Sequence, residues 1–364
     1  MKTISRVIHN FNAGPSILPR EVFEEASQAV LDFNGTGLSI LELGHRTETF
    51  QAVMDEAIQL AKSLMNLDAE HEVLFLHGGA STQFFQVPMN LLNENEIAAY
   101  TDTGVWATKA IKEAQLFGHV EIVCSSKDSG YTYLPKNFTV SKTAKYLHLT
   151  SNNTIYGSQW QNFELFHQAG VPLVADMSSD ILSRDIDFNL FDLIYAGAQK
   201  NVGAAGVNLV VVNKNILGKV ERKIPVMMDY RNHIENGSML NTPPVFSIYV
   251  CLLTLRWLKN QGGISGIEKI NREKAALVYE AIDQFPIFRG QIAKEDRSLM
   301  NVCFAIQDLT LEKTFLQECK TNGMIGVKGH RSAGGFRISL YNALPIESVY
   351  AITDLMKDFA KRKG

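Results

Sequence analysis

Apolar residues between about positions 20 and 220 fall into short runs that alternate with stretches of helical spacing. The runs are aliphatic and rarely alternate with polar residues, which is typical of parallel strands buried on both faces. In residues 50–64, by contrast, apolar residues recur every three or four positions, as on one face of a helix. This alternation predicts an α/β fold with a mostly parallel seven-stranded sheet flanked by helices. We expect its strands at residues 73–76, 97–100, 120–123, 146–149, 173–175, 193–195 and 209–212.

The rest of the chain predicts a second, smaller domain. With 364 residues the chain exceeds the roughly 250 to 300 at which a single hydrophobic core stops growing. The pair Gly262 and Gly263 separates two stretches of helical spacing and is a natural helix stop. We expect a large domain over 16–262 and a small α+β domain over 263–364, with residues 1–15 packing near the small one. Further expected elements are helices at 246–260, 264–284, 310–321 and 345–361, strands at 301–306 and 336–340, and long loops at 126–142 and 222–245.

Composition narrows the possible functions. A net charge of -3 at pH 7 offers no positive footprint for nucleic acid. The four cysteines form no CxxC pair, which argues against a zinc site, a redox pair or a disulfide framework. The N-terminus lacks the apolar segment of a signal peptide, and no apolar run approaches the ~20 residues of a membrane span. We expect a soluble cytoplasmic protein that binds neither nucleic acid nor a membrane.

Two charged residues follow predicted strands and point to a reactive amine. Lys200 lies among small residues soon after the run 193–195, and Asp176 ends the run 173–175. An ammonium in a poorly solvated turn loses hydration, so its pKa falls and the free amine becomes available as a nucleophile. An acid and an amine together are what pyridoxal phosphate needs at its ring nitrogen and its aldehyde. The alternative is a solvated loop lysine, the usual place for this residue type.

Other residues at the predicted strand ends would join this site. Residues 77–83 contain a Gly-Gly turn that precedes a helix, where backbone N–H groups and the helix N-terminus favour a phosphate; a plain tight turn is the alternative. Trp106 could stack on a flat ring or simply belong to the core, and Thr154 could donate its hydroxyl or be an ordinary loop residue. Because ligands of parallel sheets bind beyond the carboxyl ends of the strands, these segments converge on one edge.

A cationic set completes the candidate chemistry. It consists of His45, Arg46, His330, Arg331 and Arg337 in a chain of slightly negative charge. Arginine suits bidentate capture of carboxylate or phosphate, although any one arginine alone is more often part of a surface ion pair.

Read together, these segments resemble the class V aminotransferases of fold type I, and within them the enzymes that form phosphoserine. The likeness spans almost the whole chain. Two departures, Gly44 where the family commonly has serine and Ala204 where it commonly has proline, remove no functional side chain. The matching stretches are residues 11–15, 44–46, 78–84, 176–180, 196–201, 241–244 and 329–337.

The resemblance implies a role for each residue around the cofactor pyridoxal 5'-phosphate. Lys200 would bond covalently to its aldehyde, and Asp176 would pair with its ring nitrogen. Trp106 would stack on the ring and Thr154 would contact the phenolate oxygen. The phosphate group would be held by Gly79, Ala80 and Gln199, with Asn241 and Thr242 from the partner subunit of a homodimer.

The implied reaction is a ping-pong transamination. Glutamate would donate its amino group and 3-phosphohydroxypyruvate would accept it, with Arg337 on the α-carboxylate. His45, Arg46, His330 and Arg331 would bind the distal phosphate or carboxylate, and 4-phosphohydroxythreonine of the vitamin B6 route is a possible further substrate.

Three alternatives remain at this point. A serine-glyoxylate type transaminase would not need the pair His330 and Arg331. A cysteine desulfurase would need a mobile nucleophilic cysteine, whereas Cys319 falls in an expected helix. A non-catalytic nucleotide-binding protein would carry no covalently bound chromophore.

Overall fold

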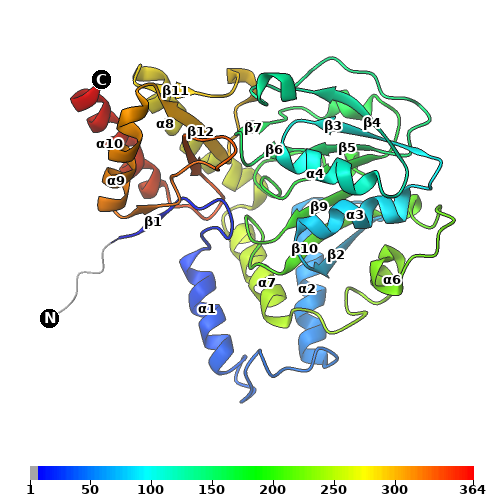
Figure 1. Cartoon of the computed structure of the whole chain (residues 1–364). Coiled ribbons are helices and arrows are strands. Elements are labelled where there is room, and N and C mark those ends of the chain that lie inside the picture. Colours follow the sequence, from blue (N-terminus) through cyan, green and yellow to red (C-terminus); the bar gives the residue numbers. More distant parts are fainter. Residues whose placement is uncertain (1–6) are drawn as a thin grey trace.

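The computed structural model describes residues 7–364, and a seven-stranded sheet forms its centre (Figure 1). All seven expected strands belong to it. Six run parallel, and β10 is antiparallel to both of its neighbours, which the sequence did not predict. The order across the sheet is β2 (His71–His77), β10 (Val207–Asn213), β9 (Leu193–Gly197), β8 (Leu173–Asp176), β5 (Leu147–Thr150), β3 (Ile97–Asp102) and β4 (His119–Ser125).

Helices cover both faces of this sheet because its central strands are apolar on both. Along β2, Val73 and Phe75 pack into one core while Leu74 and Leu76 pack into another. The first core lies under α1 (Arg20–Leu31), α2 (Glu48–Leu64) and α7 (Val245–Asn260), and it reaches α5 (Glu164–His167). The second lies under α3 (Ala80–Leu91), α4 (Val105–Ala114) and α6 (Tyr230–Glu235).

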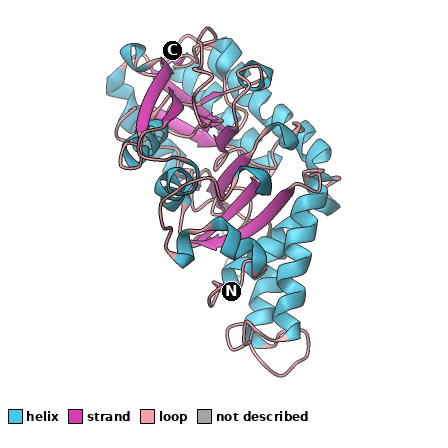
Figure 2. Ribbon diagram, turned by 90° about the vertical axis from the view of Figure 1, so that its right-hand side faces the viewer, coloured by secondary structure: helices cyan, strands magenta, loops and turns pink. Residues whose placement is uncertain are grey.

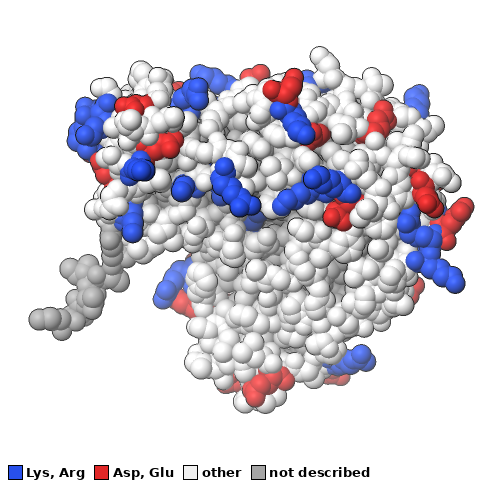
Figure 3. All heavy atoms as spheres, in the orientation of Figure 1, with Lys and Arg blue, Asp and Glu red and all other residues white. Residues whose placement is uncertain are grey.

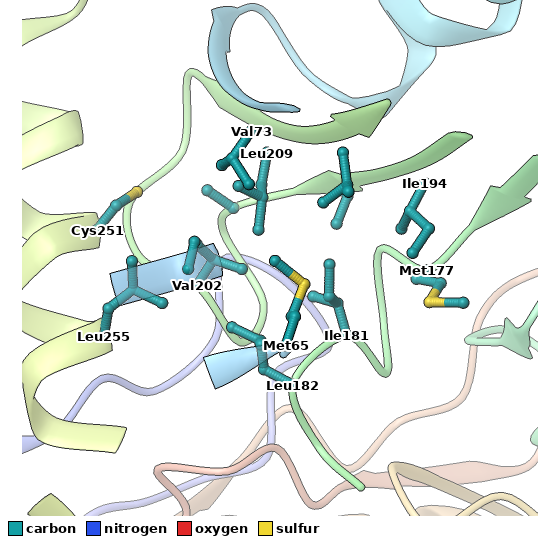
Figure 4. Packing of buried hydrophobic residues seen from close by; sticks show 14 of the residues in the cluster. Met65, Val73, Met177, Ile181, Leu182, Ile194, Val202, Leu209, Cys251 and Leu255 are labelled. Atoms are coloured by element: carbon teal, nitrogen blue, oxygen red, sulfur yellow. The ribbon is translucent and has the colours of Figure 1, made fainter. Parts of the chain in front are cut away.

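Figure 4 shows the first core at close range. Val73, Leu209 and Ile194 point from the sheet toward Met65 and Leu182. All of these side chains are at most 2% exposed, so the sheet is rigidly backed on this side.

The C-terminal part builds a second sheet, which Figure 2 shows apart from the first. This antiparallel sheet has the order β11 (Phe288–Gly290), β12 (Asn301–Ile306), β14 (Phe336–Ser339). Its core contains Phe304, Phe315 and Phe359. The covering helices are α8 (Gly263–Gln284), α9 (Glu312–Thr321) and α10 (Ile346–Lys363).

The N-terminal segment joins this second core. β1 (His9–Asn10) pairs in parallel with β13 (Met324–Ile325), and Phe11 is fully buried in the C-terminal cluster. Helix α8 belongs to both cores, since Ile264 packs in the first and Val278 in the C-terminal one.

Segment 222–245 differs from the loop that we expected. It contains α6, a helix of six residues, which is too short to give a clear apolar period. The Asp229 side chain caps it by accepting from the Arg231 amide, and Tyr230 is fully buried. The remaining short elements are the strands β6 (Asn152–Asn153) and β7 (Ser158–Gln159) and the 3-10 turns Lys127–Ser129, Phe188–Leu190, Lys214–Ile216, Val226–Met228, Lys294–Asp296 and Leu309–Leu311.

Among residues 7–364, no helix combines the length and the apolar character needed to cross a membrane.

Candidate active site

A cavity of about 130 Å³ opens at the carboxyl ends of the central strands. Seven of the predicted site residues line it, so the convergence that we expected from the strand ends is present. They are Gly79, Ala80, Trp106, Thr154, Asp176, Gln199 and Lys200.

Lys200 follows β9 and projects into this cavity. Its Nζ donates a hydrogen bond to Thr154 Oγ1 at 2.8 Å. Burial lowers the pKa of Lys200 to about 8, a shift that the Asp176 charge opposes and the Arg337 charge reinforces. The N-terminal segment packs closely against this side chain, since a Cβ added at Gly14 would lie 3.5 Å from Lys200 Cγ. The amine is therefore partly deprotonated near neutral pH and held in one place.

Asp176 is the last residue of β8 and is 5% exposed. Its Oδ1 accepts from the Ser178 amide at 2.9 Å. Burial raises the pKa of Asp176, while the hydrogen bonds from Ser178 and the charge of Lys200 oppose that rise. An acid of this kind can share a proton with a basic nitrogen placed in the same cavity.

The turn before α3 forms a cradle suited to an anion. Gly78 has φ +96°, and a Cβ there would lie 2.7 Å from Thr82 Cγ2, so this tight position favours glycine. The Gly79 carbonyl accepts from Asn208 Nδ2 and Thr82 Oγ1 at 2.9 and 2.8 Å. The first amides of α3 have no acceptor within the helix, and a Cβ at Gly79 would meet nothing within 4 Å.

Two buried polar atoms on the cavity wall have no hydrogen-bond partner among the described residues. They are Nε1 of Trp106 and Oγ1 of Thr150. Because unpaired buried polar groups are costly, such atoms in a cavity are typical of a site that a polar ligand completes. Trp106 leans on Phe84, with ring centroids 6.5 Å apart.

Three members of the cationic set lie together beside the cavity. Arg337, on β14, donates from Nη1 to the Thr154 carbonyl at 3.2 Å. Burial and the charges of Arg337 and Arg331 lower the pKa of His330. His330 Nδ1 lies 2.7 Å from Ser332 Oγ and 3.2 Å from the Ser332 amide nitrogen, so Ser332 holds the imidazole in place.

The other four predicted site residues do not line the cavity of this chain. His45 and Arg46 lie in the loop between α1 and α2, which projects at the bottom of Figure 1. Arg46 Nε donates to His45 Nε2 at 3.4 Å. Asn241 Nδ2 donates to His77 Nε2 at 3.0 Å, and Thr242 is exposed.

Comparison with known proteins settles the family. The model of the family "Aminotransferase class-V" matches residues 8–352. The chain is a class V aminotransferase. This confirms the family resemblance and the prediction of an enzyme, against the alternative of a non-catalytic nucleotide-binding protein.

The relatives of this aminotransferase are full-length matches. It is 56% identical over 350 residues to a phosphoserine aminotransferase of Flavobacterium johnsoniae, covering 96% of this chain and 98% of that protein. It is 54% identical to the phosphoserine aminotransferase of Bacteroides thetaiotaomicron, covering 97% and 99%. A solved phosphoserine aminotransferase from Bacillus circulans subsp. alkalophilus superposes with a TM-score of 0.95 at 44% identity, covering 98% and 99%. These likenesses confirm the fold type I architecture.

The aminotransferase cavity also contains residues that the sequence analysis missed. Each of them could have been found from its position, because each lies within a few residues of a predicted strand end or of the Gly-Gly turn. They are Ser81, Phe84, Thr150, Asn152, Ser178 and Ser179. Cys319, in contrast, is 1% exposed within α9, and burial raises its pKa to about 12, so it is no desulfurase nucleophile.

Proposed function

We propose that this aminotransferase transfers the amino group of glutamate to 3-phosphohydroxypyruvate, forming phosphoserine and 2-oxoglutarate. One observation carries the proposal: Lys200 and Asp176 share a cavity that the anion cradle lines, and a group of cations lies beside it. The names of the relatives support it, and the serine-glyoxylate alternative has less support.

The cavity fits pyridoxal 5'-phosphate as the cofactor. A solved relative from Trichomonas vaginalis, 34% identical with a TM-score of 0.89 and covering 96% of this chain and 100% of that one, is described as bound to it. In this chain Lys200 would hold the aldehyde end, Asp176 the ring nitrogen and Trp106 the ring face. Thr154 would meet the phenolate oxygen. The start of α3, at Gly79 and Ala80, would hold the phosphate together with Gln199.

Once bound, the cofactor supplies an electron sink for the substrate carbon that loses its proton. Lys200 moves that proton as general base and acid, for which a pKa of about 8 is well matched to neutral pH. Asp176 keeps a negative charge near the ring nitrogen. The hydrogen bond that the lysine amine donates to Thr154 Oγ1 orients this amine.

The cations would bind the substrate. Arg337 would pair with the α-carboxylate, while His330 and Arg331 would bind the distal phosphate or carboxylate. Because His45 and Arg46 lie away from this cavity, we propose that the matching residues of a second copy complete it.

The phosphate cradle would likewise be completed by residues of a second copy. Asn241 and Thr242 also lie outside this chain's cavity, which supports a homodimer with shared active sites. The division into domains 16–262 and 263–364, a cytoplasmic location and activity on 4-phosphohydroxythreonine are further predictions.

Covalent trapping tests this proposal directly. Wild-type protein loaded with pyridoxal phosphate and reduced with borohydride should gain the cofactor's mass on the peptide that contains Lys200. Lys200→Ala should remove the label while near-ultraviolet circular dichroism shows an intact fold. A label on a different lysine, or none, would contradict the assignment.

Substrate preference is tested on the same preparation. Glutamate with 3-phosphohydroxypyruvate should react faster than alanine with glyoxylate. The reverse order would instead favour a glyoxylate-type enzyme.

A further inference from the structure

Positive charge gathers on one face of the molecule. Figure 3 shows Lys and Arg side chains in a band that extends from the C-terminal part toward α4. Arg331 and Arg337 both lie near His330, since their charges act on its imidazole. A third cation, Lys109 of α4, acts on the same imidazole.

Lys109 is held at the edge of the cavity by its position on the helix. It lies three residues after Trp106, so both side chains emerge on the same face of α4. Its Nζ lies 4.4 Å from the centroid of the Trp106 ring. Trp106 lines the cavity and Lys109 does not, so the ammonium lies outside the enclosed part, near enough for its charge to act on His330.

Lys109 forms no ion pair with a carboxylate of the described part of the chain. None of the ion pairs among residues 7–364 includes Lys109, Arg331 or Arg337. Every charge that shifts His330 is also a cation. Three cations that act on one imidazole, and that form no ion pair among residues 7–364, attract an anion in proportion to its charge.

We propose that Lys109 is a further specificity-determining residue, a cation at the cavity mouth that favours doubly charged distal groups over singly charged ones. This inference rests on the proposed function, in which the same pocket accepts a phosphate ester and the glutamate carboxylate in turn. Lys109 raises the affinity for both, but it acts on the phosphate with twice the charge product.

The charge product fixes the size of the effect. Two unit charges about 6 Å apart in water attract by an amount that corresponds to about a threefold change in affinity. For a dianion the factor is squared, to about tenfold. Loss of Lys109 therefore weakens phosphate binding about three times more than carboxylate binding.

The test compares Lys109→Gln with Lys109→Arg and Lys112→Gln in the cofactor-loaded protein. Lys112 is the matched control, an exposed lysine on α4 whose charge is not among those that act on His330. Calorimetric titration with inorganic phosphate and with acetate, at pH 8 where phosphate is mostly a dianion, measures the two affinities. KM values for 3-phosphohydroxypyruvate and glutamate are measured alongside.

Lys109→Gln should weaken phosphate about tenfold and acetate about threefold, with cofactor occupancy unchanged. Lys109→Arg and Lys112→Gln should both stay within about twofold of wild type, and high salt should reduce the difference. An equal loss for both anions, or the same loss in Lys112→Gln, would overturn the proposal. If wild type fails to convert 3-phosphohydroxypyruvate, the proposed function fails, and the titrations still decide the role of Lys109.

Discussion

Lys200 and Lys274 are two lysines whose pKa is lowered by burial, to about 8 and about 7, in very different surroundings. Lys200 retains some exposure to the cavity and makes one side-chain hydrogen bond, to Thr154, near the charge of Asp176. Lys274 is 0% exposed and belongs to no ion pair found among residues 7–364. Its Nζ donates to the carbonyls of Leu340 and Tyr341, both at 2.9 Å.

Lys274 is part of a buried hydrogen-bond network that joins α8 to the segment after β14. Asn271 Nδ2 donates to Asn342 Oδ1 at 2.8 Å, and the Asn342 amide donates to Asn201 Oδ1 at 3.0 Å. Through these bonds the C-terminal core is tied to the residue next to Lys200. Burial lowers the pKa of the lysine in both settings. Access to a cavity and a nearby acid distinguish the reactive amine from the structural one.

Replacing each lysine by methionine should separate these roles. Lys274→Met keeps the aliphatic stem but leaves several buried carbonyls unpaired, so the free energy of unfolding should fall by about 2 to 3 kcal/mol. Lys200→Met in the cofactor-free protein breaks one hydrogen bond and removes a desolvated charge, so the change should stay below about 1 kcal/mol. Urea unfolding followed by circular dichroism measures both. Equal losses would remove the distinction between the two sites.

The dependence of stability on pH sharpens the same comparison. Because the folded pKa of Lys274 is lower than the unfolded value, the unfolded chain binds more protons between about pH 7 and 10. The contribution of Lys274 to the unfolding free energy of the cofactor-free protein should therefore rise with pH across this window. Lys274→Met should reduce the slope by up to about 1.4 kcal/mol per pH unit. The reduction is smaller to the extent that the carbonyl oxygens, by accepting hydrogen bonds, stabilise the protonated amine. A slope identical to wild type would show that Lys274 does not titrate there.

The hydrophobic periodicity of α8 indicates that Lys274 is buried, which we did not predict from the sequence. The spacing Ile267, Asn271, Lys274, Val278 places the lysine on the apolar face of α8, since these residues are three or four positions apart. The burial of Lys274 could therefore have been predicted from the sequence. The carbonyl groups that its amine binds could not, because residues 340–344 follow a different strand.

The residues of the cofactor cavity could be predicted from the sequence more completely than the surroundings of the anion-binding cations. Parallel strands bring their carboxyl ends to one edge, so Asp176 and Lys200 could be placed together from the chain alone. His45 and Arg46 lie in a loop whose position no strand order dictates. Lys109 was missed because an exposed helix lysine is ordinary until its neighbours are known.

Replacing Asp176 tests whether a nearby acid distinguishes Lys200 from Lys274. Asp176 raises the pKa of Lys200 against the effect of burial, so Asp176→Asn should lower that pKa further below 8. We expect a shift of less than about one pH unit, because the open cavity lets solvent screen the two charges. The rate of reductive methylation of Lys200 in the cofactor-free protein, followed by peptide mass spectrometry from pH 6 to 10, gives the midpoint. Exposed lysines in the same digest should keep theirs, and Lys274 should stay unmodified while the fold persists, since no reagent reaches it. An unchanged or higher midpoint for Lys200 would mean that the carboxylate does not act on this amine.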